Sequence, residues 1–268
     1  MPQLIHKELT YIVRGVLFDV YNQLGPRLPE EFYQKAITHG LKEQGITCEP
    51  EKEFEVTYRN QSAGTYKVDH WLANGKLLLE IKVAPGIMPI HQAQTISYLK
   101  VTNADLAIIA NFGAKPLQDQ RLPNFIREKT PNFQWQRQPL TKDTLYPELT
   151  NRILEALHRV HFTLGPGFIH RVYRGAVMIE LQHQGMGYEQ IKKIPFYYKN
   201  YYIDVQKAQM IKVENKVLLG VFAVEVVDEV KAIVMKARMK RLGVKLGFLA
   251  NFYGKELKIE RVFDDNVV

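Results

Sequence analysis

The chain repeats itself. Shifted by 140 residues, the 268-residue sequence aligns with itself without a gap, and 29 of the 114 residue pairs from Glu8/Glu148 to Arg121/Arg261 are identical. That share, about a quarter, is several times what composition alone would give. Self-similarity at one fixed period indicates a duplicated structural unit. We therefore predict two domains of ordinary size, at residues 1–140 and 141–268.

The repeat is selective. Framework segments recur, such as the Leu-Gly-Pro turn at 24–26 and 164–166 and the Ala-Asn-Phe segment at 110–112 and 250–252. Four polar residues of the first half do not recur. The aligned pairs are Glu30 with His170, Asp69 with Gln209, Glu80 with Gly220, and Lys82 with Phe222. Any chemistry that needs all four groups is therefore confined to the first half.

The composition places the chain among globular proteins, with 46% hydrophobic and 24% charged residues. No stretch approaches the ~20 apolar residues that cross a bilayer, and the N-terminus lacks the basic and apolar regions of a signal peptide. The single cysteine, Cys48, rules out an internal disulfide and most thiolate metal sites. That usage is typical of a reducing compartment, and we expect a cytoplasmic protein.

The net charge of +8 is unevenly distributed. The first half holds 16 basic and 14 acidic residues, whereas the second holds 20 and 14. Excess positive charge favours polyanionic partners such as nucleic acid. Many cytosolic proteins are equally basic without such a partner, so charge alone leaves both possibilities open.

Hydrophobic periodicity predicts the order α, α, β, β, β, α, β in each half. In the first half the expected helices are 8–24, 29–44 and 89–101, and the expected strands are 53–58, 66–73, 77–84 and 106–110. A turn at 60–64 and a hairpin turn at Asn74-Gly75 connect the strands. The segment from about 116 to 147 has five prolines and little periodicity, so we expect the linker there.

The strongest chemical signal is Asp69 followed, after ten residues, by Glu80-Ile81-Lys82. The Asn74-Gly75 hairpin would fold the Asp69 strand back onto the Glu80 strand. Glu80 and Lys82 are two apart on a strand, so their side chains share a face. Two carboxylates, with the Ile81 carbonyl between them, offer the hard oxygen ligands suited to Mg²⁺. Lys82 could then orient a water molecule or stabilise the charge of a phosphate.

Glu-x-Lys is also common on solvated strands, where it forms a surface ion pair of small energy. Here, however, Glu80 and Lys82 interrupt a run that otherwise reads as buried, from Leu77 to Val83. Burying charges without a partner or a metal is costly. Their position therefore favours a metal site.

Two helices could add to this site. Glu30 and Tyr33 lie three apart at the start of the second helix and share a face, although the helix dipole alone favours a first-turn glutamate. Gln94 and Tyr98 lie four apart on the third helix, and either a contact with the site or an ordinary polar face fits them.

Taken together, these motifs resemble the GxxExxY proteins, a branch of the PD-(D/E)XK nuclease superfamily. The resemblance covers nearly all of residues 8–115. It rests on Gly25-Pro26, Glu30, Tyr33, Asp69, Glu80-Ile81-Lys82, Gln94, Tyr98-Leu99 and Asn111-Phe112-Gly113. One departure is Arg27, which stands where the family has a second glycine and where the second half keeps Gly167. Arg27 would change the turn or add a phosphate contact.

The resemblance implies an α/β fold of two tandem restriction-endonuclease-like domains, each with a mixed central sheet flanked by helices. It also implies divalent-metal-dependent cleavage of DNA or RNA, with Mg²⁺ as the expected cofactor and Mn²⁺ as an alternative. The catalytic set would be Glu30, Asp69, Glu80 and Lys82, supported by Tyr33, Gln94 and Tyr98. Asp69, Glu80 and the Ile81 carbonyl would ligate the metal. The second half is then a catalytically inactive copy, and the two halves could pair as a pseudo-dimer.

The second half carries a basic cluster, expected on a helix over 231–242, that could bind a phosphate backbone. The residues concerned are Lys236, Arg238, Lys240 and Arg241, with Lys245 just beyond the helix. A solvated basic face is the alternative. Four tyrosines at 197–198 and 201–202 could stack on bases or simply occupy half-buried strands.

The leading hypothesis is a Mg²⁺-dependent nuclease with one N-terminal active site and a basic C-terminal domain that assists binding or stability. A second hypothesis is a nucleic-acid-binding or protein-interaction module that keeps the fold without cutting. A third is a site that acts only in complex with a partner protein. Sequence alone does not distinguish DNA from RNA as the substrate.

Overall fold

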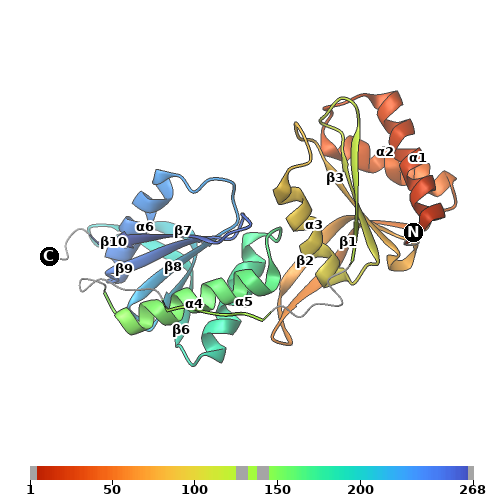
Figure 1. Cartoon of the computed structure of the whole chain (residues 1–268). Helices are drawn as coiled ribbons and strands as arrows, with labels where there is room; N and C mark the ends of the chain where they lie inside the picture. The colour runs from red at the N-terminus through yellow and green to blue at the C-terminus, as the bar shows by residue number, and fades with distance from the viewer. Residues whose placement is uncertain (1–4, 125–131, 138–144, 265–268) are drawn as a thin grey trace. The chain divides into compact units, whose positions relative to one another are not determined.

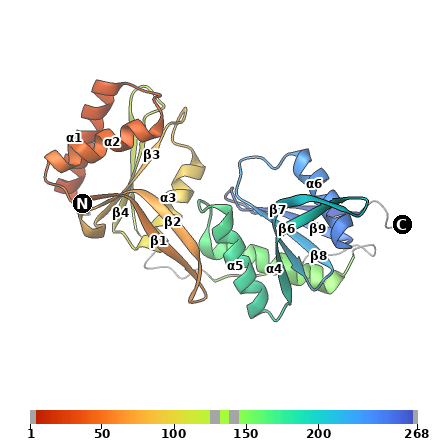
Figure 2. The same cartoon turned by 180° about the vertical axis from the view of Figure 1, so that it is seen from behind.

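The computed structural model describes residues 5–124, 132–137 and 145–264. The chain forms two compact units, one of Met1–Val56 with Thr65–Asn132 and the other of Thr57–Gly64 with Phe133–Val268. Figures 1 and 2 show them from opposite sides. Among the described residues, no helix is long and apolar enough to cross a membrane.

The first unit is built on a five-stranded mixed sheet of order β1-β2-β3-β4-β5. Strands β3 and β4 are parallel, and β2 and β5 run antiparallel to their neighbours β3 and β4. Helices α1 and α2 lie on one side of the sheet and α3 on the other (Figure 1). The elements are α1 Lys7–Leu24, α2 Glu30–Glu43, β1 Cys48–Tyr58, β2 Gln61–Leu72, the 3₁₀ turn η1 Ala73–Gly75, β3 Leu77–Lys82, α3 Pro89–Thr102, β4 Leu106–Asn111 and β5 Gln118–Pro123.

The second unit repeats this arrangement, with a five-stranded sheet of order β10-β9-β8-β7-β6. Its parallel pair is β8 and β9, and the other neighbours are antiparallel. The elements are α4 Pro147–Leu164, α5 His170–His183, β6 Tyr188–Tyr198, β7 Tyr201–Val213, β8 Val217–Phe222, α6 Glu229–Leu242, β9 Leu246–Asn251 and β10 Lys258–Phe263. The expected α/β fold with two mixed sheets is confirmed.

Helices cover both faces of the central strands, so the central strands are apolar throughout rather than alternating. All six residues of β4 are buried, as are Leu77 to Ile81 of β3. On one side, Val13 and Leu17 of α1 and Ile37 of α2 pack against this layer. Glu80 is therefore a carboxylic acid set into a hydrophobic strand.

Several boundaries differ from the sequence expectations. Strand β5 occupies 118–123, inside the segment expected to be linker, because it is a polar, partly exposed edge strand without apolar alternation. The expected turn at 60–64 is tighter: Arg59 and Asn60, both with positive φ, make the turn, and β2 begins at Gln61. The rest of the expected linker lies partly outside the described residues, at 125–131 and 138–144.

The repeated Asn-Phe segment is structural in both units. The Asn111 side chain accepts a hydrogen bond from the Ala84 N–H and donates one to the Ala84 carbonyl, both at 2.9 Å. Asn251 makes the same pair of bonds with Val224, at 3.1 and 2.7 Å. Each asparagine braces the loop that leaves the central strand, which explains why this residue persists in both copies.

Candidate functional site

Asp69 is held beside the central strand by a backbone hydrogen bond. The paired register of β2 and β3 ends at His70 and Leu79, one residue short of Asp69. There the Asp69 carboxylate accepts the Ile81 N–H at 2.7 Å through Oδ2. The Asp69 side chain thus replaces the next backbone hydrogen bond between β2 and β3. This contact fixes its carboxylate next to Glu80-Ile81-Lys82.

Glu80 and Lys82 form a buried ion pair on the same face of β3. Lys82 Nζ donates to Glu80 Oε1 at 2.7 Å, and Glu80 is only 5% exposed. The other oxygen, Oε2, is buried and has no hydrogen-bond partner among the described residues. A buried carboxylate oxygen that lacks a partner is costly, and a cation would satisfy it.

The electrostatics of the pair follow from burial and crowding. Desolvation, followed by the neighbouring Asp69 carboxylate, raises the pKa of Glu80 to about 8. Burial disfavours the charged form of Lys82, but the carboxylates of Glu80, Asp69 and Glu30 outweigh it and raise the pKa of the ammonium. Lys82 is therefore a cation at neutral pH, whereas burial and Asp69 keep Glu80 largely protonated there unless a further positive charge joins the site.

Helix α2 supplies Glu30 and, one turn later, Gln34. Gln34 Nε2 donates to Glu30 Oε1 at 3.3 Å and to Asp69 Oδ1 at 3.2 Å, so a single amide bridges two carboxylates from different elements. Burial and then Asp69 raise the pKa of Glu30. The structure thus brings together the four residues predicted from the sequence, Glu30, Asp69, Glu80 and Lys82, which form the acidic set.

Sequence reasoning missed Gln34. The signal was available, because Gln34 aligns with Arg174 in the second half and so changes together with the other four. A glutamine on a helix is common, however, and only its contact with Asp69, 35 residues away, gives it significance.

Tyr66 was also missed, and it connects the supporting residue Tyr98 to the site. The rings of Tyr66 and Tyr98 stack with centroids 4.2 Å apart, and both are buried. Burial, followed by the Glu80 carboxylate, raises the pKa of Tyr66, so its hydroxyl stays protonated beside the acidic set. Gln94, one turn before Tyr98 on α3, is half-buried.

Tyr33 acts on the backbone rather than among the carboxylates. Its hydroxyl donates to the Gly25 carbonyl at 2.7 Å and accepts the Leu28 N–H at 2.9 Å. Its ring, fully buried, stacks on Phe112 with centroids 4.2 Å apart. Tyr33 therefore fixes the turn that precedes Glu30, and its predicted role in supporting the site stays a prediction.

Arg27 completes that turn. It adopts a left-handed conformation, with φ of 68°, which explains why a glycine can stand at the equivalent position of the repeat. Its Nε donates to the Gly113 carbonyl at 3.2 Å. Arg27 therefore braces the loop after β4 in addition to changing the turn.

In the second unit an aromatic side chain fills the position equivalent to Glu80 and Lys82. A Cβ at Gly220 would lie 2.7 Å from the ring of Phe222, so this ring covers the position that Glu80 and Lys82 share in the first unit. Gln209, which aligns with Asp69, has a φ of 54°, and its carbonyl accepts a hydrogen bond from Arg174 at 3.1 Å. The β7–β8 pairing is also shifted by one residue, with Ile211 opposite Leu219, whereas the repeat alignment would place it opposite Leu218.

The basic cluster on α6 is only partly a free surface. Lys240, Arg241 and Lys245 are exposed, and so is Lys236. Arg238 is different, because its half-buried guanidinium donates to the Lys207 carbonyl at 3.1 Å and to the Ala208 carbonyl at 3.4 Å. The expectation that Arg238 binds nucleic acid is therefore corrected: this side chain braces α6 against β7.

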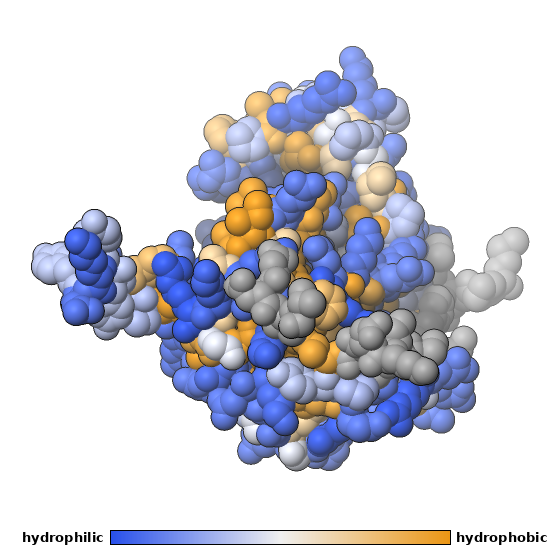
Figure 3. Space-filling view, turned by 90° about the vertical axis from the view of Figure 1, so that its left-hand side faces the viewer, coloured by the Kyte–Doolittle hydropathy of each residue, from blue (hydrophilic) through white to orange (hydrophobic). Residues whose placement is uncertain are grey.

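Apolar side chains interrupt the basic surface. Figure 3 shows orange atoms among blue ones on the face turned to the viewer. In the second unit, Val230 and Ile233 on α6 and Phe263 on β10 are exposed at 43–65%. Exposed apolar side chains therefore accompany the lysines of α6.

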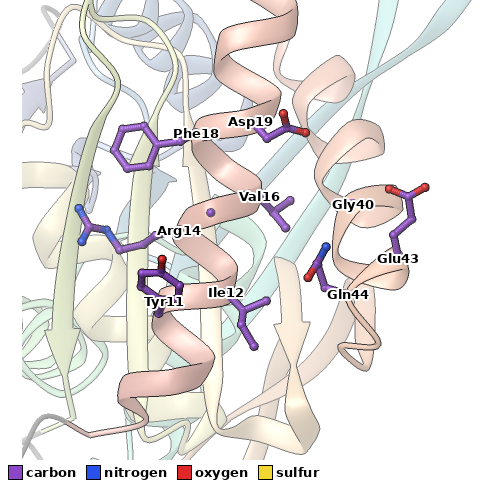
Figure 4. A pocket seen from close by; sticks show the side chains of 10 residues that line it. Tyr11, Ile12, Arg14, Val16, Phe18, Asp19, Gly40, Glu43 and Gln44 are labelled. Carbon is purple, nitrogen blue, oxygen red and sulfur yellow. The ribbon is translucent and has the colours of Figure 1, made fainter.

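A pocket on the first unit lies apart from the acidic set. It lies between α1 and α2 and includes Tyr11, Phe18 and Asp19 from α1 and Glu43 from α2 (Figure 4). Its lining contains none of Glu30, Asp69, Glu80 or Lys82. The two helices approach closely there because Gly40 has no side chain, and a Cβ on it would lie 2.8 Å from Val16 Cγ1.

The acidic set fits a hard divalent cation. Among the described residues, no cluster of three or more His, Cys, Asp or Glu side chains is arranged as a ready-made metal site. Mg²⁺ seldom needs one, since it is usually held by one or two carboxylates with several waters. Asp69, Glu80 with its partnerless Oε2, and the Ile81 carbonyl make such an open donor set.

A comparison with family sequence models identifies the family of both units. The sequence model of the PD-(D/E)XK nuclease superfamily matches residues 7–122 and again residues 147–262. The chain belongs to the PD-(D/E)XK nuclease superfamily. The superfamily name spells Pro-Asp, followed farther along by Asp or Glu, any residue and Lys. The first unit has Val68 in place of the proline, then Asp69 and Glu80-Ile81-Lys82.

No curated protein matched the chain. Among solved structures, one titled "Crystal structure of SSO0001" is similar at 16% identity with a TM-score of 0.29. The match covers 52% of this chain and 60% of the solved one, less than two thirds of that protein.

Proposed function

We propose that the protein is a Mg²⁺-dependent nuclease of the GxxExxY type, with one active site, in its first unit. The observation that carries the proposal is the convergence of Asp69, Glu80 and Lys82 at one buried point of β2 and β3, bridged by Gln34 to Glu30. Members of this superfamily are usually nucleases, and the second unit has lost the same set.

Each residue has a role that follows from its contacts. Asp69, Glu80 and the Ile81 carbonyl would hold the metal, which supplies charge stabilisation at the scissile phosphate when bound. Lys82, a cation beside Glu80, orients the attacking water and offsets the developing negative charge. Glu30 assists through its position across from Asp69, and Tyr66 and Tyr98 wall the site on the side of α3.

Nucleic-acid cleavage in the presence of Mg²⁺ or Mn²⁺ tests the proposal. Asp69→Asn, Glu80→Gln and Lys82→Met should each lower the rate at least about 100-fold, because each removes a group that acts on the transition state. Lys76→Met is the matched control, since Lys76 is exposed just before the same strand.

The result can go against the proposal in two ways. Cleavage that survives all three substitutions would place the chemistry elsewhere. A wild-type protein that binds nucleic acid but never cuts it, with either metal, would support the non-catalytic binding module instead.

A further inference from the structure

The turn between β6 and β7 exposes four tyrosines. Tyr197, Tyr198, Tyr201 and Tyr202 are 59%, 67%, 74% and 49% exposed. These strands form the two-stranded ribbon at the edge of the second unit's sheet, drawn in teal in Figure 2. Large aromatic side chains this exposed are not part of a core, so stability does not explain them.

The first sheet shows that the fold does not require them. At the equivalent positions of the β1–β2 ribbon stand Thr57, Tyr58, Gln61 and Ser62, so only one of the four is aromatic. The two ribbons have the same strand order and the same position in their sheets. Three additional aromatic residues are therefore a property of the second ribbon rather than of the architecture.

The charge of the ribbon also changes sign. Residues 48–72 contain five acidic and three basic residues, whereas the equivalent residues 188–212 contain two acidic and five basic. Lys192, Lys193, Lys199 and Lys207 of the second ribbon are exposed. The exposed aromatic rings thus lie in a local excess of positive charge that the first ribbon lacks.

The arrangement presents rings in opposite pairs. Tyr197 pairs with Tyr202 across the ribbon and Tyr198 with Tyr201. Because neighbouring side chains on a strand point to opposite faces, each face carries one pair. The ammonium of Lys199 lies 5.6 Å from the centroid of the Tyr198 ring.

The ribbon also adjoins the basic helix of the same unit. The Arg241 guanidinium of α6 lies 4.0 Å from the centroid of the Phe196 ring, the residue before Tyr197. Arg238 fixes α6 to the carbonyls of Lys207 and Ala208 in β7. The tyrosines and the exposed lysines of α6 therefore belong to one contiguous part of the second unit.

We propose that the β6–β7 ribbon binds single-stranded nucleic acid, with its tyrosines stacking on unpaired bases and its lysines contacting the phosphates. Exposed aromatic rings among cations form the usual stacking platform for single strands. In a duplex the faces of the bases are already stacked and out of reach, so the tyrosines favour unpaired strands. The inference deepens the proposed function by naming its substrate class. It rests on that function only for the claim that the bound strand is then cleaved.

Binding in EDTA tests the ribbon without any cleavage. The full chain is titrated into fluorescent 20-nucleotide strands of mixed-sequence DNA and RNA, a duplex, and an abasic strand of equal charge, and anisotropy is recorded. We expect the mixed-sequence strands to bind more tightly than the duplex and the abasic strand.

The variants separate stacking from charge. Tyr198→Ser and Tyr201→Ser should each weaken single-strand binding at least about fivefold and leave abasic binding unchanged, because stacking on bases is lost and phosphate contacts are kept. Tyr198→Phe should retain the affinity. Tyr11→Ser is the matched control, since Tyr11 is 81% exposed on α1 of the first unit.

Equal affinity for mixed and abasic strands, or serine variants that bind like the wild type, would overturn the inference. A cross-linking experiment in which the tyrosines react with a protein, and in which added nucleic acid does not reduce that cross-link, would also overturn the inference. Because binding is measured in EDTA, its outcome does not depend on cleavage. A protein that binds single strands in EDTA but does not cleave them when Mg²⁺ or Mn²⁺ is added would contradict the nuclease proposal and leave the inference about the ribbon intact.

Discussion

Glu80 is the residue of the acidic set whose ionised form is strongly disfavoured in the folded protein. Its carboxyl is buried, and desolvation and Asp69 both favour the protonated form, so its pKa is about 8 in the folded protein against 4.5 for an ordinary glutamate. The folded state therefore binds a proton that the unfolded state releases at lower pH. This contribution to stability is fully present below about pH 4.5 and is lost as the pH rises through about 8.

The metal-free first unit should accordingly become less stable between pH 5 and pH 8. Urea unfolding in EDTA measures the free energy of unfolding across this range. Glu80→Gln should flatten the slope, because the amide does not titrate, whereas Glu31→Gln, at an exposed neighbour of Glu30, should leave it unchanged. A slope that is identical in wild type and Glu80→Gln would contradict the assignment.

Gln34 shows how a neutral residue can organise charged ones. Its amide bridges Glu30 and Asp69, at 3.3 and 3.2 Å, and thereby fixes the distance between a helix carboxylate and a strand carboxylate. Groups that orient metal-binding carboxylates typically matter 10- to 100-fold for activity or metal affinity. Gln34 is a positioning residue in this sense.

Gln34→Ala should lower cleavage by about 10- to 100-fold and raise the Mg²⁺ concentration needed for half-maximal rate. Gln44→Ala, just beyond the end of the same helix, is the control and should change neither quantity. A loss of rate without any change in metal dependence would indicate that Gln34 supports folding rather than the carboxylates.

At the level of the elements, the same turn occurs in both units, but it precedes a member of the acidic set only in the first. Tyr33 and Tyr173 each donate to a glycine carbonyl at 2.7 Å, and each ring stacks on the phenylalanine that follows the parallel strand. In the first unit the turn leads to Glu30, whereas in the second it leads to His170. The turn itself is a structural element in both units. The residue that follows it, Glu30 or His170, decides whether a carboxylate stands at this position.

Tyr33→Phe and Tyr173→Phe should destabilise their units by similar amounts, about 1–2 kcal/mol, because each loses the hydroxyl hydrogen bonds that close the turn. Only Tyr33→Phe should also lower cleavage, since only its turn carries Glu30. Urea unfolding and cleavage assays on both variants provide the comparison. Equal effects of the two variants on cleavage would contradict this division between framework and site.

Strand β8 shows why the second site cannot be restored by one change. The Phe222 ring covers Gly220, so a side chain at position 220 would displace it. Gln209 adopts a left-handed conformation, so the Asp69 position no longer has the same backbone. In the second unit both the side-chain packing at Gly220 and the backbone at Gln209 therefore differ from the first unit.

At the scale of the whole molecule, the described residues contain two copies of the fold and one copy of the acidic set. A single working site cuts one strand at a time. Supercoiled plasmid should therefore pass to the nicked circle before any linear product accumulates, as a time course on an agarose gel would show. Linear product without a nicked precursor would require two sites acting together, and Lys82→Met should abolish both products.

The duplication also separates the acidic residues from the basic and aromatic ones. The first unit holds the acidic set, and the second holds the basic helix and the tyrosine ribbon. A repeat without the acidic set is not constrained to keep those strand positions acidic, so its surface can carry other side chains.

Some parts of the structure were accessible from local pattern, because periodicity reports burial. The helices at 7–24 and 30–43 and the central strands follow the expected ranges closely. Strand β5 was not, since an edge strand of sequence Gln118 to Pro123 is polar and only its pairing with β4 makes it a strand. Arg238 was misread for a related reason: its charge suggested a polyanion, but its neighbours are backbone carbonyls.

Self-alignment alone shows that the unit occurs twice, that the acidic set occurs once and that its residues change together, because it compares positions without needing their coordinates. Which of these groups touch became known from the coordinates. Gln34 reaches Asp69 across 35 residues, Glu80 keeps one oxygen without a partner, and Tyr33 turns to the backbone. These depend on how a helix packs on a sheet, a long-range arrangement that spacing along the chain does not encode.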